Sequence, residues 1–188
     1  NTAGPDWAGL LQWRRSWREW ARSAEDDRLL GEHFRNTIRA SRLEASFMRG
    51  ELEWSYDRYL EQAADSIGVI VTMAALSSFW GLDMPGRMRS APFREMMHHL
   101  ACFSRLFNDL RSEEKERCEA SAVNAIVVLE RTMSREHARA FVRAESARYG
   151  RQIETALAGL EAGDPWRSVV GHLMASSHDY YDQLPRYA

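Results

Sequence analysis

The chain has 188 residues, and its 25 Lys and Arg against 27 Asp and Glu give a formal net charge of −2. This balance excludes a general polyanion-binding protein, because nucleic-acid-binding domains carry a basic excess on one face. Hydrophobic residues make up 45% of the chain and aromatic residues 11%, so it can bury a sizeable core, and its length predicts one domain.

Apolar residues recur at intervals of three and four along the chain, which predicts helices and no strand. The first expected helices cover residues 7–24, 29–47, 55–61 and 67–79. Gly81 is expected to end the last of these, because glycine is common directly after a helix.

The longest uncharged run covers residues 66–82. A membrane span needs about 20 predominantly apolar residues, whereas this run is shorter and contains Thr72, Ser77 and Ser78. We therefore expect no membrane span here, but a helix that is buried on all sides inside a bundle.

Residues 85–86, a Pro-Gly pair, predict a loop. Ser90 and Pro92 then predict the cap and first turn of a helix that continues to about Arg117. The remaining helices are expected at residues 122–133, 134–160 and 165–184. Together these elements predict a single all-α bundle.

The chain has only two cysteines, Cys102 and Cys118, and neither belongs to a Cys-x-x-Cys motif or a Cys/His cluster. No disulfide framework or structural zinc site is therefore expected. The first residues do not resemble a signal peptide. A reduced cytoplasmic setting fits these features.

The stretch from Asn108 to Glu116 carries the most specific chemical pattern. Asn108, Ser112 and Glu116 are four residues apart, so on an α-helix they project along one stripe, about 6 Å apart at each step. An amide oxygen, a hydroxyl and a carboxylate are hard ligands that suit Mg²⁺ together with waters and substrate phosphate. The alternative is a solvated acidic helix end, because polar residues four apart are common.

The residues before this stripe bear on that choice. Phe103 and Phe107 are aromatic, and they predict that the metal lies at the mouth of an apolar pocket. Arg105, one turn before Asn108, could grip a phosphate with its planar guanidinium. The alternative for Arg105 is an ion pair with Asp109, four residues further on.

Residues 108–116 resemble the second metal motif of the class I terpene synthases, Asn/Asp-Asp-Leu/Ile/Val-x-Ser/Thr-x-x-x-Glu, and match every specified position. Residues 105–107 also resemble the Arg-Leu-x entry into this motif. In the family, an Arg-Tyr pair far downstream binds diphosphate, and Arg186-Tyr187 stands at the corresponding place.

Shorter stretches narrow the resemblance to bacterial ent-kaurene synthases and related diterpene synthases. These stretches are residues 54–56, 59–60, 65–67 and 80–84. Many microbial members have a diphosphate-sensing arginine where this chain has Ala63, and kaurene-type enzymes resemble the chain in lacking it. The resemblance thus implies that phosphate binding falls to Arg105 and Arg186.

The family's first metal motif, Asp-Asp-x-x-Asp/Glu, is absent from residues 1–188. Asp26 and Asp27 begin such a pattern, but its acidic third member, Glu32, comes too late. Glu25, Asp26 and Asp27 are better read as the acidic beginning of a helix. The resemblance therefore implies that residues 1–188 are the C-terminal part of one terpene synthase α domain, a class I terpenoid synthase bundle that is incomplete at the N-terminus.

The resemblance implies ionisation of an isoprenyl diphosphate with Mg²⁺ and cyclisation of the carbocation to a hydrocarbon. The implied metal ligands are Asn108, Ser112 and Glu116. The implied catalytic residues that bind diphosphate are Arg105, Arg186 and Tyr187. The expected pocket residues are Ser66, Ile67, Phe79, Trp80, Phe103, Phe107 and Tyr180. For each aromatic residue, ordinary core packing is the alternative, and Ser66, where the family breaks a helix, could be a simple cap.

Three functions stay open at this point. The first is a diterpene synthase acting on a copalyl-type diphosphate, with the 188-residue chain expected to be inactive alone. The second is a sesquiterpene or other terpene cyclase that uses farnesyl or geranylgeranyl diphosphate. The third is a non-catalytic helical module that retains half of a metal site. The expected partner is an isoprenyl diphosphate and not nucleic acid, and homodimer formation is left open.

Overall fold

The computed structural model describes residues 16, 21–118 and 123–183, with residues 176–183 described by their backbone. The elements of this part are α2 (Ala24–Met48), α3 (Tyr56–Ser66), α4 (Val69–Trp80), α5 (Met84–Arg87), α6 (Ala91–Cys118), α7 (Ala125–Leu129), α8 (Arg135–Ala158) and α9 (Pro165–Gln183). No strand occurs among these residues, so the prediction of an all-α protein is confirmed.

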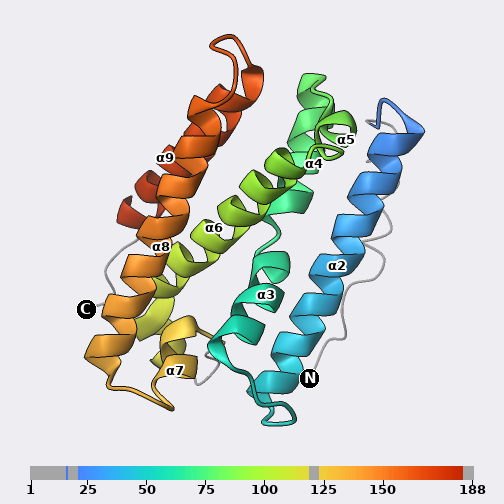
Figure 1. Ribbon diagram of the computed structural model, residues 1–188. Coiled ribbons are helices and arrows are strands. Elements are labelled where there is room, and N and C mark those ends of the chain that lie inside the picture. Colours follow the sequence, from blue (N-terminus) through green and yellow to red (C-terminus); the bar gives the residue numbers. More distant parts are fainter. Residues whose placement is uncertain (1–15, 17–20, 119–122, 184–188) are drawn as a thin grey trace.

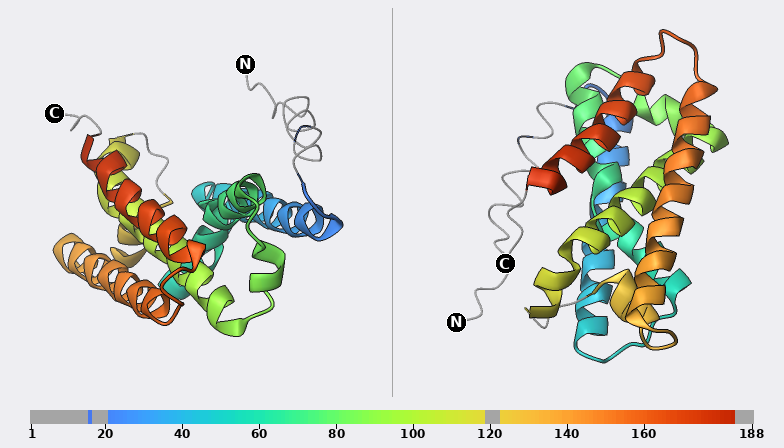
Figure 2. Two further views of the ribbon diagram at one scale, coloured as in Figure 1. Left: turned by 90° about the horizontal axis from the view of Figure 1, so that it is seen from above. Right: turned by 90° about the vertical axis from the view of Figure 1, so that its left-hand side faces the viewer.

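Helix α6 is the central element and crosses the bundle diagonally in Figure 1. It packs most extensively against α8, and it also contacts α3 and α4. Helix α2 lies along α3 and α4, whereas α9 lies against α6 (Figure 2). The short α7 lies at the end of the bundle where α6 ends and α8 begins (Figure 1). Helix α6 therefore connects the two sides of the bundle.

One face of α6 is buried along much of its length. Large apolar side chains at intervals of three and four residues form this face, and they include Phe93, Met96, Met97, Leu100 and Leu106. This spacing is the one that places residues on a single helix face. The packing fixes α6 in the bundle and, with it, the polar residues that follow.

Several helices begin where the sequence supplies a capping residue. At the beginning of α2, Ser23 Oγ accepts a hydrogen bond of 3.0 Å from the Asp26 N–H. Glu25, Asp26 and Asp27 lie in the first turn, which confirms that they are the acidic beginning of a helix. Ser134 caps α8 in the same way, by accepting from the backbone of the first turn.

The apolar segment that was expected to be buried on all sides is different in the structure. Gly68 has a φ of +73°, a left-handed conformation that glycine adopts without steric cost, and it separates α3 from α4. Met73 and Ala74 are buried on one side of α4, but Phe79 and Trp80 at its end are exposed. The prediction of burial on all sides is therefore wrong.

Residues Tyr56–Trp80 are the one stretch of the described chain that is long and apolar enough to cross a membrane, judged by length and composition alone. In the structure, the break at Gly68 divides this stretch into α3 and α4, and both helices pack against α2 and α6. Tyr59, Ala63 and Met73 belong to the core. Packing within the bundle thus buries part of this stretch, whereas Phe79 and Trp80 at its end are exposed.

Several other element boundaries differ from the sequence prediction. Helix α2 runs without a break from Ala24 to Met48, where the expected helices were 7–24 and 29–47, and α3 continues to Ser66, beyond the expected end at residue 61. The expected loop at residues 85–86 forms the short helix α5, because the Asp83 carboxylate accepts a backbone hydrogen bond of 2.8 Å and caps it. The helix expected at residues 122–133 is observed as α7 (Ala125–Leu129). It begins after Asn124, which has extended backbone angles and caps its first turn. In α5 and α7 a capping side chain sets where the helix begins.

A buried carboxylate fixes the last turns of α6 to α8. Glu113 is 1% exposed, and its oxygens lie 2.6 Å from Arg135 Nε and 2.9 Å from Arg139 Nη1. Arg117 of α6 is a third partner at 3.3 Å. Loss of one partner from a buried ion pair is strongly destabilising. This cluster therefore holds in place the turns that carry the predicted metal ligands.

Candidate metal centre on helix α6

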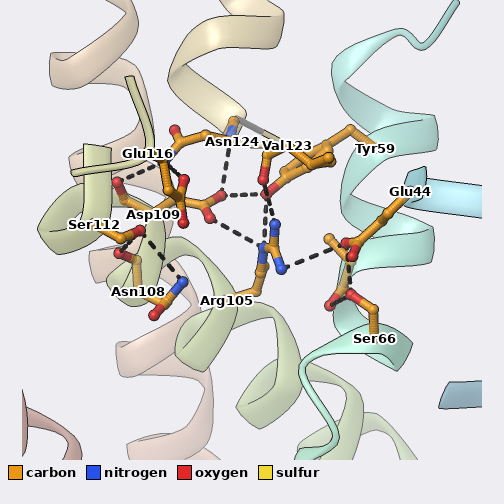
Figure 3. Close-up of polar contacts among 12 residues, drawn as sticks. Glu44, Tyr59, Ser66, Arg105, Asn108, Asp109, Ser112, Glu116, Val123 and Asn124 are labelled. Atoms are coloured by element: carbon orange, nitrogen blue, oxygen red, sulfur yellow. Dashed lines mark hydrogen bonds and ion pairs between the residues drawn. The ribbon is translucent and has the colours of Figure 1, made fainter. Parts of the chain in front are cut away.

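Asn108, Ser112 and Glu116 lie on successive turns of one face of α6, as their spacing predicts (Figure 3). Asn108 Nδ2 lies 3.4 Å from Ser112 Oγ, and Ser112 Oγ donates to the Asn108 backbone carbonyl at 2.8 Å. All three residues are half-buried. We call these three residues the stripe; it presents an amide, a hydroxyl and a carboxylate on neighbouring turns.

The carboxylate of the stripe is held by Asn124. Asn124 Nδ2 donates to Glu116 Oε2 at 2.9 Å and to the Asp109 backbone carbonyl at 2.9 Å. Asn124 itself is completely buried. Its position before the apolar residues 125–129 is a sequence signal for an N-cap, but the sequence contains no signal for its contact with Glu116.

Asp109 points into a buried network beside the stripe (Figure 3). It is 0% exposed, and its Oδ2 accepts hydrogen bonds from the Tyr59 hydroxyl at 2.5 Å and the Ala125 N–H at 3.0 Å. Its Oδ1 lies 3.0 Å from Arg105 Nε. Burial raises the pKa of the Asp109 carboxyl to about 6, although the Arg105 guanidinium and the Tyr59 hydroxyl favour the ionised form.

Arg105 occupies the centre of the same network (Figure 3). Its Nε donates to the Tyr59 hydroxyl at 2.7 Å and its Nη2 to the Val123 carbonyl at 2.5 Å. Its Nη1 lies 3.4 Å from Glu44 Oε1. Burial alone would lower the pKa of the Arg105 guanidinium, but the carboxylates of Asp109 and Glu44 raise it, so the group stays protonated.

These contacts bear on the prediction that Arg105 grips a phosphate, which stays a prediction. Its N–H groups are directed at oxygens of the protein, and its ion pair with Asp109 is the alternative that the spacing of four residues left open. Arg105 is only 9% exposed. Withdrawing it to bind phosphate would leave Asp109 buried and unpaired, which costs about 3–5 kcal/mol. In this structure, Arg105 is thus a partner of Asp109, Tyr59 and Val123 in the buried network.

The network continues to the helix break between α3 and α4. Ser66, the last residue of α3, donates to Glu44 Oε1 at 2.6 Å, and the same oxygen pairs with Arg105. Burial raises the pKa of the Glu44 carboxyl, and Arg105 acts against this rise. The break that was expected near Ser66 is present at Gly68, directly after Ile67. A continuous chain of contacts therefore joins the break to the helix that carries the stripe.

Glu44 and Tyr59 were not indicated as site residues by the sequence. Glu44 lies on α2 and Tyr59 on α3, far along the chain from their partners on α6. Tyr59 belongs to one of the stretches that resemble kaurene-type enzymes, but its residue type gives no sign of the contact with Asp109. Such long-range partners become visible only when the helices are packed.

The charges beside the stripe fit a divalent cation. The carboxylates of Glu44 and Asp109 pair with the guanidinium of Arg105, and the Glu116 carboxylate lies close enough to act on both. This group carries two formal negative charges when all three carboxylates are ionised. Within the described residues, no cluster of three or more His, Cys, Asp or Glu could hold a metal ion. A metal at this place therefore needs the amide and hydroxyl oxygens of the stripe as well as Glu116, and hard cations accept such ligands.

The aromatic residues that were predicted beside the stripe lie on another face. Phe103 is two and a half helical turns before Ser112 at 3.6 residues per turn, so it faces the opposite side of α6. Phe103 and Phe107 stack there, with ring centroids 5.8 Å apart. In this structure the two rings thus form a surface apart from Ser112, because residues close in sequence diverge around a helix; where the metal lies relative to this surface stays a prediction.

Phe103 and Phe107 instead line a groove of about 570 Å³ between α6 and α8, together with arginines from both helices. Phe79 and Trp80, also predicted for the pocket wall, are not among the residues that line this groove. They are 70% and 51% exposed at the end of α4. These four aromatic residues therefore do not gather around the stripe.

Three further predicted residues lie beyond the described side chains. Arg186 and Tyr187 lie outside the described residues, and Tyr180 belongs to the part of α9 that is described by its backbone. Their roles in closing the site and lining the pocket stay predictions.

Residues 4–149 match a protein-family model described as terpene synthase family 2, C-terminal metal binding. The match covers more than three quarters of the chain and includes the whole stripe and its buried network. The metal-binding description agrees with a set of hard oxygen ligands on α6.

Proposed function

This chain belongs to terpene synthase family 2, in its C-terminal metal-binding part, and from that we propose that it serves a terpene cyclase in which Mg²⁺ is bound by the stripe. The substrate is an isoprenyl diphosphate, which loses its diphosphate group and forms a carbocation that cyclises. The observation that carries this proposal is the arrangement of Asn108, Ser112 and Glu116 on one helix face, beside a network with excess negative charge.

The contacts indicate which role the metal, the stripe and the buried network each have in the proposed reaction. When bound, the metal supplies Lewis-acid stabilisation of the negative charge that develops on the departing diphosphate. The stripe holds the cation through its amide, hydroxyl and carboxylate oxygens. The buried network of Arg105, Asp109 and Tyr59 fixes α6 to α3, so the ligands are held in place before substrate arrives. Preorganised groups of this kind need no rearrangement during the reaction.

We propose that Arg105 supports the site from inside and that diphosphate is bound by Arg186 and Tyr187. The buried contacts of Arg105 favour this division. Ala63 stands where many microbial members have a diphosphate-sensing arginine. It is completely buried, and its methyl side chain cannot bind diphosphate. We further propose that the helix break after Ser66 faces the substrate, and the Ser66 contact with Glu44 supports it by linking the break to the network.

For the substrate, we propose a copalyl-type diphosphate and an ent-kaurene synthase-like diterpene cyclisation. This choice rests on the short stretches of sequence that resemble such enzymes, including residues 54–56 and 80–84. Farnesyl and geranylgeranyl diphosphate are the alternative substrates. The non-catalytic helical module remains the alternative from another class, and the absence of an aspartate-rich motif from residues 1–188 is the observation in its favour.

A screen of the full-length gene product against copalyl, geranylgeranyl and farnesyl diphosphate separates these functions. Each reaction is run with Mg²⁺ and with EDTA, and hexane extracts are analysed by gas chromatography with mass detection. We expect a polycyclic hydrocarbon from copalyl diphosphate, and only with Mg²⁺. A product from farnesyl diphosphate alone would overturn the diterpene assignment, and the lack of any product would favour the module.

A further inference from the structure

The side chain of Asn124 joins α6 to α7 directly beside the predicted metal ligand Glu116 (Figure 3). Its Oδ1 accepts a hydrogen bond of 2.9 Å from the Ile126 N–H. Its Nδ2 donates to Glu116 Oε2 and to the Asp109 backbone carbonyl, both at 2.9 Å. An asparagine amide offers two N–H donors and one acceptor oxygen. In this buried place both donors and the oxygen are used.

These surroundings fix the direction in which the amide points. A flipped amide would place Oδ1 against the Asp109 carbonyl and the Glu116 carboxylate, which are both acceptors, and would direct its N–H groups at the Ile126 N–H. The orientation that directs an N–H of Asn124 at Glu116 is therefore fixed by two backbone groups, the Ile126 N–H of α7 and the Asp109 carbonyl of α6.

Glu116, in contrast, is half-buried and has a long side chain that loses rotamer freedom when it is ordered. Asn124 holds its Oε2, and its Oε1 makes no hydrogen bond to another described residue. Because Asn124 is neutral, it orders the carboxylate without cancelling the charge that attracts a cation. An arginine or lysine in this place would cancel that charge.

We infer that Asn124 is a positioning residue for metal binding, which orders the Glu116 carboxylate before the cation arrives. This inference rests on the proposed function, because it takes Glu116 as a metal ligand. Supporting partners of this kind typically change metal affinity 10- to 100-fold when they are lost. The contact reaches Glu116 from α7, an element that carries none of the stripe residues.

The test is a titration of the full-length protein with Mn²⁺ alone, in which electron paramagnetic resonance reports the free ion. In Asn124→Ser, serine still caps α7 but does not offer the two amide donors. We expect its Mn²⁺ affinity to be about 10- to 100-fold weaker than that of the wild type. Ser134→Ala is the matched control, because it removes the cap of α8 and leaves Glu116 untouched; its affinity should be unchanged.

Two further measurements keep the outcomes distinct. In the Glu116→Gln background, Asn124→Ser should weaken Mn²⁺ binding no further, because the carboxylate that Asn124 orders is already absent.

A second measurement applies if Asn124→Ser does not fold. The side-chain amide resonances of Asn124 in the wild type should shift when Mg²⁺ is added, and static resonances at saturating Mg²⁺ would overturn the inference. Equal Mn²⁺ affinity of folded Asn124→Ser and wild type would overturn it while sparing the proposed function. A wild type that binds no Mn²⁺ would overturn the metal site itself.

Discussion

Glu116→Gln is expected to reduce hydrocarbon formation by the full-length protein about 10²- to 10³-fold, the range found when one preorganised electrostatic group is removed from a reacting site. Glutamine keeps the length of the side chain but lacks the negative charge that a cation requires. Asn108→Ala should cause a loss of similar size, because it removes the amide oxygen at the other end of the stripe. Gas chromatography of hexane extracts at fixed Mg²⁺ measures both variants.

Glu114→Gln is the matched control for this experiment. Glu114 lies on the same helix, is 71% exposed through its side chain, and pairs with Arg135 at the surface. Exposed ion pairs contribute little to stability, so this variant should form product at the wild-type rate. Full product formation by Glu116→Gln, with Glu114→Gln also active, would contradict the assignment of Glu116 as a metal ligand.

Arg105→Met is expected to lower the free energy of unfolding by about 3–5 kcal/mol, because it leaves the Asp109 carboxylate buried without its ion-pair partner. It also deprives the Tyr59 hydroxyl and the Val123 carbonyl of a donor. Urea denaturation followed by circular dichroism measures the loss. A residue that only gripped phosphate would show no such effect on the stability of the free protein.

The double variant Arg105→Met/Asp109→Asn tests whether the two groups act as a pair. Its loss of stability should be smaller than the sum of the single losses, because residues in one network are not additive. Arg105→Met with wild-type stability in urea and impaired diphosphate binding would contradict the supporting role and restore direct phosphate binding by Arg105.

The sequence alone was sufficient for the features that depend on local pattern. The period of apolar residues predicted α6 nearly to its last residue, and the spacing of Asn108, Ser112 and Glu116 predicted their common face. The acidic first turn of α2 and the glycine that ends α4 were also predicted, because these signals act within one turn of helix.

The features that depend on packing could not be predicted in this way. Glu44 and Asn124 reach α6 from other elements, and nothing in their local sequence specifies these contacts. For Arg105, the local pattern allowed either a phosphate or Asp109 as partner, and the burial of the helix face decided for Asp109. Phe103 and Phe107 line a groove between α6 and α8, a placement that their sequence neighbourhood to Asn108 did not predict.

The central claim is that the stripe binds a divalent metal. It is tested most directly by anomalous diffraction from crystals of the full-length protein grown with Mn²⁺ and inorganic diphosphate. The account predicts an anomalous peak within about 2.0–2.2 Å of oxygens from Asn108, Ser112 and Glu116, with the diphosphate on its other side. Bound Mn²⁺ and diphosphate at another place, with the stripe free of metal, would contradict it.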